Sequence, residues 1–195
     1  IGYIGLSHLG ICSLLSTASK NFYVYGFDND KKKIRLLNDK KSNIEEKNFK
    51  KYLNLYYKNI NFTSTLSDLS KCNIVYISED VETDKKGNSN IYKVKKLINN
   101  ALKVINKNAT LIILCQIPPG FTRKIKWPNN KLFYQVETLI FGNALYRASF
   151  PERIIIGANR NNDYKKNPFL SNFLRFFKCP IIVMNYESAE LTKIS

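Results

Sequence analysis

The chain lacks the features of membrane-spanning proteins and of secreted proteins held by disulfides. Its longest apolar runs, such as residues 110–115, are far shorter than the roughly 20 residues that a membrane-spanning helix needs. No basic start is followed by an apolar stretch and a small-residue cleavage site, so we expect no signal peptide. None of its four cysteines has C-x-x-C spacing, so the sequence gives no support for a zinc site. We expect free thiols, a cytoplasmic location and no metal centre.

Histidine and acidic residues are also scarce. His8 is the only histidine and has no partner motif, so we interpret it as a surface or packing residue. The 31 basic residues exceed the 15 acidic ones, giving a net charge of +16. Most of the basic residues are lysines spread among asparagines, whereas arginine, the usual reader of bases and phosphates, is sparse. We expect no nucleic-acid partner, although this field would attract phosphorylated anions.

Length and composition indicate one globular domain. A chain of 195 residues with 44% hydrophobic residues buries a full core without disulfides or metal. It begins at Ile1 rather than Met and ends at Ser195, where a helical pattern opens, so we expect part of a longer protein. We predict a domain over residues 1–185 and, over residues 186–195, the start of a helix that leads to further domains.

Short apolar runs alternate with helical patterns along the chain. The strand-like runs are Tyr23–Phe27, Ile74–Ile77, Thr110–Cys115, Leu132–Tyr134, Arg153–Ile156 and Cys179–Met184. The helical patterns are Leu6–Ala18, Lys31–Asn38, Ile91–Ile105 and Phe169–Phe177. This alternation predicts an α/β, Rossmann-like, doubly wound and mainly parallel sheet with helices on both faces. We expect truncation at both ends, with nearly all of the first strand before residue 1.

The first residues fit part of a phosphate-binding turn. In Gly2-Tyr3-Ile4-Gly5, the two glycines match the second and third of a G-x-G-x-x-G motif. The second glycine of that motif lets the backbone approach a pyrophosphate, and the third lets the helix pack against the strand. Asp28 ends the next strand, 23 positions after Gly5, close to the expected position of an acid that binds ribose hydroxyls.

The predicted cofactor is a dinucleotide. An acid at position 28 favours NAD over NADP because it repels a 2′-phosphate, while the lysines at 31–33 soften that preference. We expect Gly2, Tyr3, Ile4, Gly5 and Asp28 to bind it, together with Ser78 and Gln116 at the ends of two other strands. The alternative is an ordinary strand–helix–strand unit in which Asp28 is a turn residue.

Six segments, in order, resemble the UDP-glucose/GDP-mannose dehydrogenase family of NAD-dependent nucleotide-sugar dehydrogenases. They are Gly2-Tyr-Ile-Gly-Leu6, Tyr25-Gly-Phe-Asp-Asn-Asp30, Cys115-Gln-Ile-Pro-Pro-Gly120, Val136-Glu137, Pro151-Glu-Arg-Ile-Ile-Ile-Gly157 and Ser188-Ala-Glu-Leu-Thr-Lys193. Their family counterparts are G-Y-V-G-L, G-x-D-x-D, S-T-V-P-x-G, P-E, P-D-R-I-V-I-G and S-A-E-L-x-K. The resemblance covers essentially the whole chain, as the family's N-terminal NAD-binding domain.

The resemblance implies an activity and two catalytic residues. Enzymes of this family oxidise a sugar primary alcohol to a carboxylate with two NAD⁺, through a thioester on a cysteine. Glu137 then matches the general base for the hydrolytic water, and Lys193 matches the lysine that stabilises the oxyanion. The family's cysteine lies in a G-G-x-C-x-x-K-D segment that this chain lacks, so we expect the chain alone not to turn over. We interpret Cys115 as a buried strand thiol.

Departures from the pattern bear on the substrate. Gln116 stands where threonine is usual, Val136 replaces proline, and Thr138-Leu139 replaces Phe-Leu after the glutamate. We expect a UDP-sugar, UDP-glucose first, as the substrate of a homodimeric enzyme of polysaccharide biosynthesis. Two alternatives stay open: a β-hydroxyacid or 6-phosphogluconate-type dehydrogenase, and a non-catalytic basic module that binds nucleotides.

Overall fold

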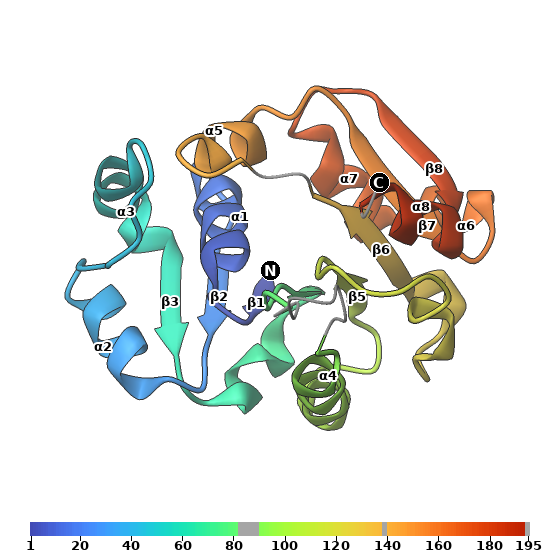
Figure 1. Cartoon of the computed structure of the whole chain (residues 1–195), viewed down its shortest axis with the longest axis horizontal. Coiled ribbons are helices and arrows are strands. Elements are labelled where there is room, and N and C mark those ends of the chain that lie inside the picture. Colours follow the sequence, from blue (N-terminus) through green and yellow to red (C-terminus); the bar gives the residue numbers. More distant parts are fainter. Residues whose placement is uncertain (82–89, 138–139, 194–195) are drawn as a thin grey trace.

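The computed structural model describes residues 1–81, 90–137 and 140–193, which form an eight-stranded sheet between helices (Figure 1). The strand order is β3-β2-β1-β4-β5-β6-β7-β8, and neighbours run parallel except β6 and β7. The strands are β1 (Gly2–Ile4), β2 (Val24–Phe27), β3 (Ile60–Thr63), β4 (Ile74–Ile77), β5 (Thr110–Ile113), β6 (Leu132–Val136), β7 (Ile154–Ala158) and β8 (Ile181–Asn185). The Rossmann-like prediction is confirmed.

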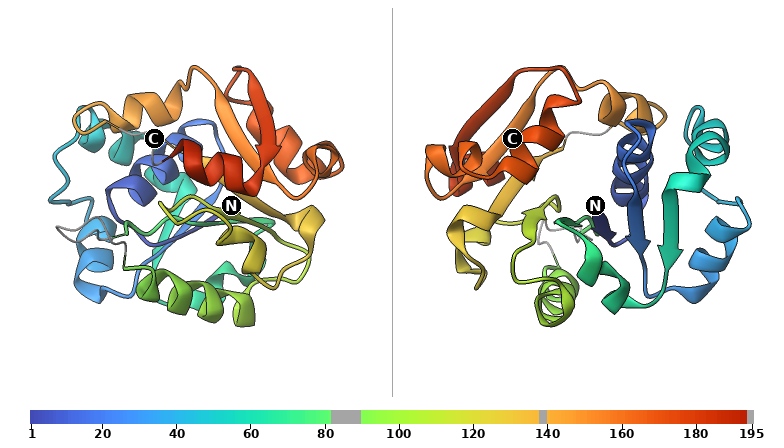
Figure 2. Two further views of the ribbon diagram at one scale, coloured as in Figure 1. Left: turned by 45° about the vertical axis from the view of Figure 1, so that its right-hand side comes forward. Right: turned by 180° about the vertical axis from the view of Figure 1, so that it is seen from behind.

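Helices cover both faces of the sheet (Figure 2). They are α1 (His8–Ser19), α2 (Lys31–Asn38), α3 (Phe49–Tyr56), α4 (Tyr92–Val104), α5 (Ala144–Ser149), α6 (Asn161–Lys165), α7 (Pro168–Arg175) and α8 (Tyr186–Thr192). Successive side chains of β4 point to opposite faces of the sheet, as in any pleated strand, and so belong to two different hydrophobic clusters. Tyr76 packs with α1, α5 and α7, whereas Val75 and Ile77 pack with α4 and α8. None of the described helices has the length and apolar character to cross a membrane.

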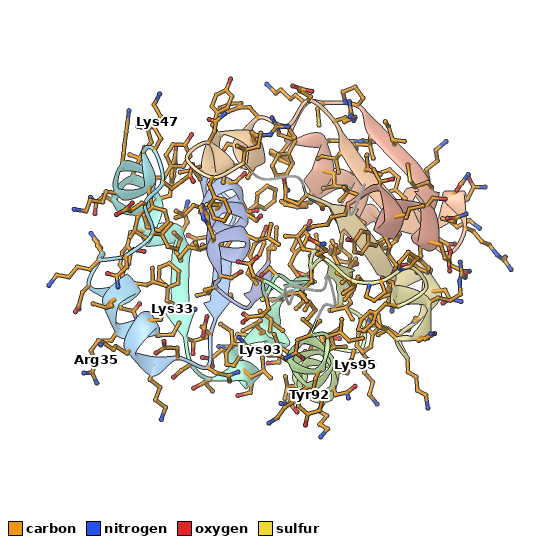
Figure 3. All side chains as sticks on the ribbon, in the orientation of Figure 1. Lys33, Arg35, Lys47, Tyr92, Lys93 and Lys95 are labelled. Atoms are coloured by element: carbon orange, nitrogen blue, oxygen red, sulfur yellow. The ribbon has the colours of Figure 1, made fainter. Side chains whose placement is uncertain are left out.

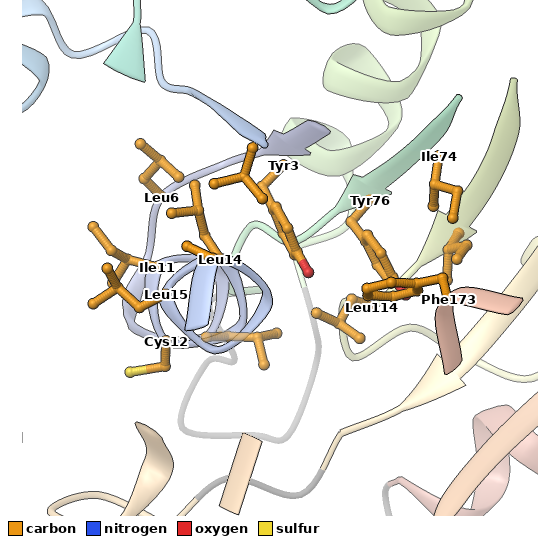
Figure 4. Packing of buried hydrophobic residues seen from close by; sticks show 14 of the residues in the cluster. Tyr3, Leu6, Ile11, Cys12, Leu14, Leu15, Ile74, Tyr76, Leu114 and Phe173 are labelled. Carbon is orange, nitrogen blue, oxygen red and sulfur yellow. The ribbon is translucent and has the colours of Figure 1, made fainter. Parts of the chain in front are cut away.

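Two buried tyrosines anchor α1 to the centre of the sheet (Figure 4). The rings of Tyr3 and Tyr76 stack with centroids 4.9 Å apart and planes 6° from parallel. The Tyr3 hydroxyl lies 2.6 Å from Thr17 Oγ1, and the Tyr76 hydroxyl donates to Gln135 Oε1 over 3.1 Å. Each buried hydroxyl therefore has a partner, as burial of a polar group requires.

The structure corrects two expectations about the first third of the chain. Residues Gly2–Ile4 form β1, which pairs with both β2 and β4, so the chain contains a first strand. The segment after α2, for which the sequence predicted neither a helix nor a strand, leads into α3 and then β3. Phe49 and Leu53 lie one helical turn apart and are both buried, which gives α3 its core face.

The predicted helix at residue 186 is present as α8 and packs on β6 and β7. The Tyr186 hydroxyl donates to Leu132 O over 2.7 Å, and Ala189 is buried against Gly157. On the same helix, the fully buried carboxylate of Glu190 accepts hydrogen bonds from the N–H groups of Gly120 (2.5 Å) and Thr122 (2.7 Å). Glu190 thereby fixes the turn after β5 to α8. The division at residue 185 stays a prediction.

Removing the Glu190 carboxylate should cost stability. Glu190→Ala leaves two N–H groups without their acceptor, and we expect a loss of about 2–4 kcal/mol in the free energy of unfolding, measured by denaturant titration. The control is Glu187→Ala on the same helix, because Glu187 is exposed and paired with Arg123. We expect that surface pair to contribute less than about 1 kcal/mol. Equal losses in the two variants would contradict the anchoring role.

Candidate functional site

A tight turn joins β1 to α1. Gly5 follows the strand with φ of +94° and donates its N–H to Phe27 O over 2.9 Å. A Cβ on Gly10 would lie 2.0 Å from Gly5 O, so only glycine permits this approach of helix and turn. Residues 5–10 therefore read G-L-S-H-L-G, the spacing of a G-x-G-x-x-G motif with Ser7 at the second glycine. The start of α1 closes this strand–turn–helix corner.

This geometry corrects the predicted cofactor contacts of Gly2, Tyr3 and Ile4. All three lie inside β1, and the side chains of Tyr3 and Ile4 are 2% and 0% exposed. In the structure the motif begins at Gly5 and its third glycine is Gly10, so the register lies five residues later than the sequence suggested. The register was misread because Gly2 and Gly5 also have the spacing of the second and third glycines.

Asp28 faces this turn from the end of β2. Its Oδ2 accepts the N–H of Leu6 over 3.1 Å and the Nζ of Lys33 over 2.6 Å, and its Oδ1 accepts the N–H of Asp30 over 2.9 Å. The side chain is 11% exposed. Asp28 therefore occupies the position of the ribose-binding acid and, at the same time, holds the turn.

Ser78 and Glu79 follow β4 and line the other side of the turn. Ser78 is fully buried, and its hydroxyl donates to Gly5 O over 2.8 Å, so it supports the turn and is not exposed to a cofactor. The Glu79 carboxylate sits against Gly5 and forms a 2.5 Å ion pair with Lys93. Ser7 bridges the same segment, because its Oγ donates to Ser78 O and accepts from the N–H of Asp80.

A cleft of about 420 Å³ opens beside Gly5 and Asp28. Its lining includes Lys33, Lys93 and Lys96. Figure 3 shows Lys33 and Lys93 on the same side of the molecule, near the starts of α2 and α4. This cleft lies at the carboxyl ends of parallel strands, where such sheets bind their ligands. The free N–H groups at the start of a helix suit a pyrophosphate, and the acid suits a ribose, so the residues fit a dinucleotide.

A second cleft, of about 520 Å³, brings together the residues predicted to act in catalysis. Glu137, at the end of β6, and Lys193, after α8, line it with Gln116. His8 also lines this cleft from the start of α1. Lys193 Nζ donates to Leu114 O over 2.5 Å, which holds the ammonium group near the end of β5. Thr138 and Leu139, the departures that follow Glu137, lie outside the described residues.

Burial shifts the pKa values of two ionisable side chains, Glu137 and Lys193, that line this cleft. Desolvation raises the pKa of Glu137 to about 7, although Lys193 and Arg147 oppose the shift. Desolvation lowers the pKa of Lys193, and the nearby Cys115 and Glu137 oppose that shift. A carboxyl poised near neutrality is suited to accept a proton, and a buried ammonium is suited to stabilise an oxyanion. Cys115 is buried and donates to Ile77 O, and desolvation raises its pKa to about 12, which suits an inert thiol.

The sequence reasoning missed Gly10, Ser7 and Glu46. Gly10 carried a readable signal, because it lies five positions after Gly5, the distance from the first to the third glycine of the motif. Glu46 had no such signal. Its carboxylate reaches His8 Nε2 over 2.9 Å and the N–H of Gly142 over 3.1 Å, contacts between segments far apart in the sequence.

Comparison with known proteins agrees with this geometry. Residues 1–170 match the model of the UDP-glucose/GDP-mannose dehydrogenase family, NAD binding domain. The chain is 29% identical over 161 residues to the UDP-glucose 6-dehydrogenase of Campylobacter jejuni, covering 80% of the chain and 40% of the relative. It is 27% identical over 160 residues to the UDP-N-acetyl-D-mannosamine dehydrogenase of Pyrococcus horikoshii, covering 80% of the chain and 37% of the relative.

The structure resembles that of the GDP-mannose dehydrogenase from Pseudomonas aeruginosa, with a TM-score of 0.88 and 19% identity over 99% of this chain and 48% of the other. The chain thus spans less than half the length of these relatives. The family match covers most of the chain, and the strand–turn–helix corner with its acid is present in the structure. The chain therefore belongs to the UDP-glucose/GDP-mannose dehydrogenase family, as an NAD-binding domain.

Proposed function

We propose that this domain serves a nucleotide-sugar 6-dehydrogenase that oxidises the primary alcohol of a UDP-sugar, UDP-glucose first, to the carboxylate. Two NAD⁺ and one water would yield the carboxylate, two NADH and three protons. The observation that carries the proposal is the shared cleft of Glu137, Lys193 and Gln116 beside the glycine turn. The thiol that would carry the thioester belongs to a segment that the 195 residues do not contain.

NAD supplies the hydride acceptor when it is bound, and this chain's residues hold it. We assign the pyrophosphate to the N–H groups at the start of α1, next to Gly5 and Gly10, where a helix N-terminus favours an anion. We assign the adenosine ribose to Asp28. The Glu79–Lys93 ion pair keeps the acid next to Gly5 from repelling the pyrophosphate.

Glu137 and Lys193 have different roles in the proposed hydrolysis of the thioester. Glu137 takes a proton from the water that attacks the thioester, because its raised pKa places it near neutrality. Lys193 stabilises the oxygen that becomes negative during that attack. Gln116 is exposed in the same cleft and orients water or cofactor through its amide.

The remaining proposals rest on the family. We propose a cytoplasmic homodimer in polysaccharide biosynthesis. A hydroxyacid or 6-phosphogluconate-type dehydrogenase is a second candidate, since it shares the glycine turn and the acid. A ratio of two NADH formed per sugar consumed favours the nucleotide-sugar enzyme, and a ratio of one favours the hydroxyacid enzyme.

The function is tested in the longest protein that the gene encodes, assayed with UDP-glucose, UDP-N-acetylmannosamine and GDP-mannose. We expect UDP-glucose to give two NADH per sugar and Lys193→Ala to lower kcat on the order of 100-fold, as loss of an oxyanion donor does. The control is Lys131→Ala, because the ammonium of Lys131 donates to Asn108 Oδ1 and this residue is not part of the lining of the second cleft. Normal turnover of Lys193→Ala would contradict the role of this lysine.

A pH series tests the environment of Glu137. The folded pKa, about 7, lies above the unfolded value of 4.5, so the folded state holds the proton more tightly between these values. The proton on Glu137 therefore stabilises the folded state. Its contribution to the unfolding free energy is complete below pH 4.5 and is lost as the pH rises to about 7. We expect the unfolding free energy of the wild type to fall over that window relative to Glu137→Gln, measured by denaturant titration. A constant difference between the two proteins would contradict the raised pKa.

The preference for NAD over NADP tests whether the ion pair of Lys33 with Asp28 affects cofactor binding. Lys33 neutralises Asp28 and is 38% exposed in the side chain. We expect Lys33→Ala to raise the ratio of the NADP to the NAD dissociation constant on the order of tenfold, about 1.4 kcal/mol, because the unpaired acid repels the 2′-phosphate. Isothermal titration calorimetry measures both constants, with exposed Lys31→Ala as the control. An unchanged ratio in Lys33→Ala would contradict this assignment.

A further inference from the structure

One cluster of metal-ligating side chains lies beside the second cleft and has no part in the proposed chemistry. It comprises His8 and Cys12 of α1 and Glu46 of the segment that joins α2 to α3. An imidazole nitrogen of His8, the Sγ of Cys12 and a carboxylate oxygen of Glu46 lie within 4.8 Å of one another. Residues 8 and 12 are four apart, so their side chains lie on one face of the helix.

The Glu46 carboxylate is the unusual member of the cluster. Its side chain is 0% exposed. Oε2 has two partners, His8 Nε2 at 2.9 Å and the N–H of Gly142 at 3.1 Å. Oε1 is buried, and no residue that the structure describes gives it a hydrogen bond. A buried carboxylate oxygen without a donor costs free energy unless a cation or other donor reaches it.

The side chains around the cluster leave it shielded from bulk water. Cys12 is fully buried, and the His8 ring, 18% exposed, packs edge-on against Phe141 with centroids 4.7 Å apart. Burial raises the pKa of the Cys12 thiol, and the charges of Glu46, Glu137 and Asp80 raise it further. The neighbourhood is thus negative, and a dication would reverse that effect.

We propose that His8, Cys12 and Glu46 form a site for one divalent transition-metal ion of the zinc type. Imidazole nitrogen, thiolate and carboxylate are the ligands that zinc takes in proteins, and three of them leave a fourth position for water. A metal bonded at about 2.0–2.3 Å needs ligand atoms roughly 3.3–3.8 Å apart. The observed spacing, from 2.9 Å to at most 4.8 Å, brackets that need.

Charge balance supports the assignment. A dication with one thiolate, one carboxylate and a neutral imidazole has no net charge, which suits a buried position. On binding, the Cys12 thiol releases its proton to solvent, the sulfur and Glu46 Oε1 bond to the metal, and neutral His8 offers Nε2 with its proton on Nδ1. The ion would join α1, the segment before α3 and, through Gly142, the segment after Glu137.

The test is a titration of the metal-free chain with Co²⁺ and then Zn²⁺. We expect one Co²⁺ per chain with sulfur-to-cobalt charge-transfer absorption, displaced by Zn²⁺. Cys12→Ser should abolish that absorption and weaken binding at least about tenfold, whereas Cys179→Ser should behave as the wild type, since this half-buried thiol lies outside the cluster.

The single histidine gives a second measurement that needs no variant. Its two imidazole ¹⁵N resonances are unambiguous, and Zn²⁺ should shift Nε2 strongly and leave the proton on Nδ1. Absence of saturable binding by the wild type, or charge transfer retained in Cys12→Ser, would overturn the proposal. Unmoved imidazole resonances in the presence of Zn²⁺ would overturn it equally. None of these readouts depends on NAD or on turnover.

Discussion

The Asp28 carboxylate connects the end of β2 to the turn between β1 and α1. It accepts hydrogen bonds from the N–H groups of Leu6 and Asp30 and from Lys33. Such charge-assisted hydrogen bonds are stronger than neutral ones. The same turn is fixed from within by the positive φ of Gly5 and the close approach of Gly10. These contacts therefore fix the start of α1, and the anion site that we propose there, relative to the sheet.

Desolvation shifts the pKa values of two side chains in the second cleft, which His8 at the start of α1 also lines. Glu137 and Lys193 are held at the ends of β6 and α8, and burial pushes each towards its neutral form. The opposite charge of each partner opposes this effect, so it limits the shift of both pKa values. The cleft thus offers a proton acceptor and a cation side by side, without a histidine in either role.

Most of the patterned elements were predictable from the sequence, and α3 and β3 were missed. The apolar spacing of α4 and the runs of β4 and β5 sit where the pattern placed them, because each buries a continuous apolar face. Lysines and asparagines lie between the apolar residues of both elements, such as Phe49 and Leu53 in α3 and Ile60 and Phe62 in β3, and they hid the pattern. Glu137 and Lys193 were located only through the family resemblance, since a strand-end acid and a helix lysine carry no pattern of their own.

The glycine turn shows a different limit. Local spacing alone fitted two registers, and only the pairing of Gly2–Ile4 with strands on both sides decides between them. Contacts such as Glu190 with the turn after β5, or Glu46 with Gly142, join residues about 70 and 96 positions apart, respectively. Such contacts depend on the fold as a whole and leave no trace in neighbouring residues.

The central claim is that the dinucleotide rests on the turn of residues 5–10 and on Asp28. The most direct measurement is a crystal structure of this chain with NAD. The account predicts the pyrophosphate within hydrogen-bond distance of the N–H groups at the start of α1, and a ribose hydroxyl donating to Asp28. A pyrophosphate bound elsewhere, or an Asp28 carboxylate without a ribose contact, would contradict it.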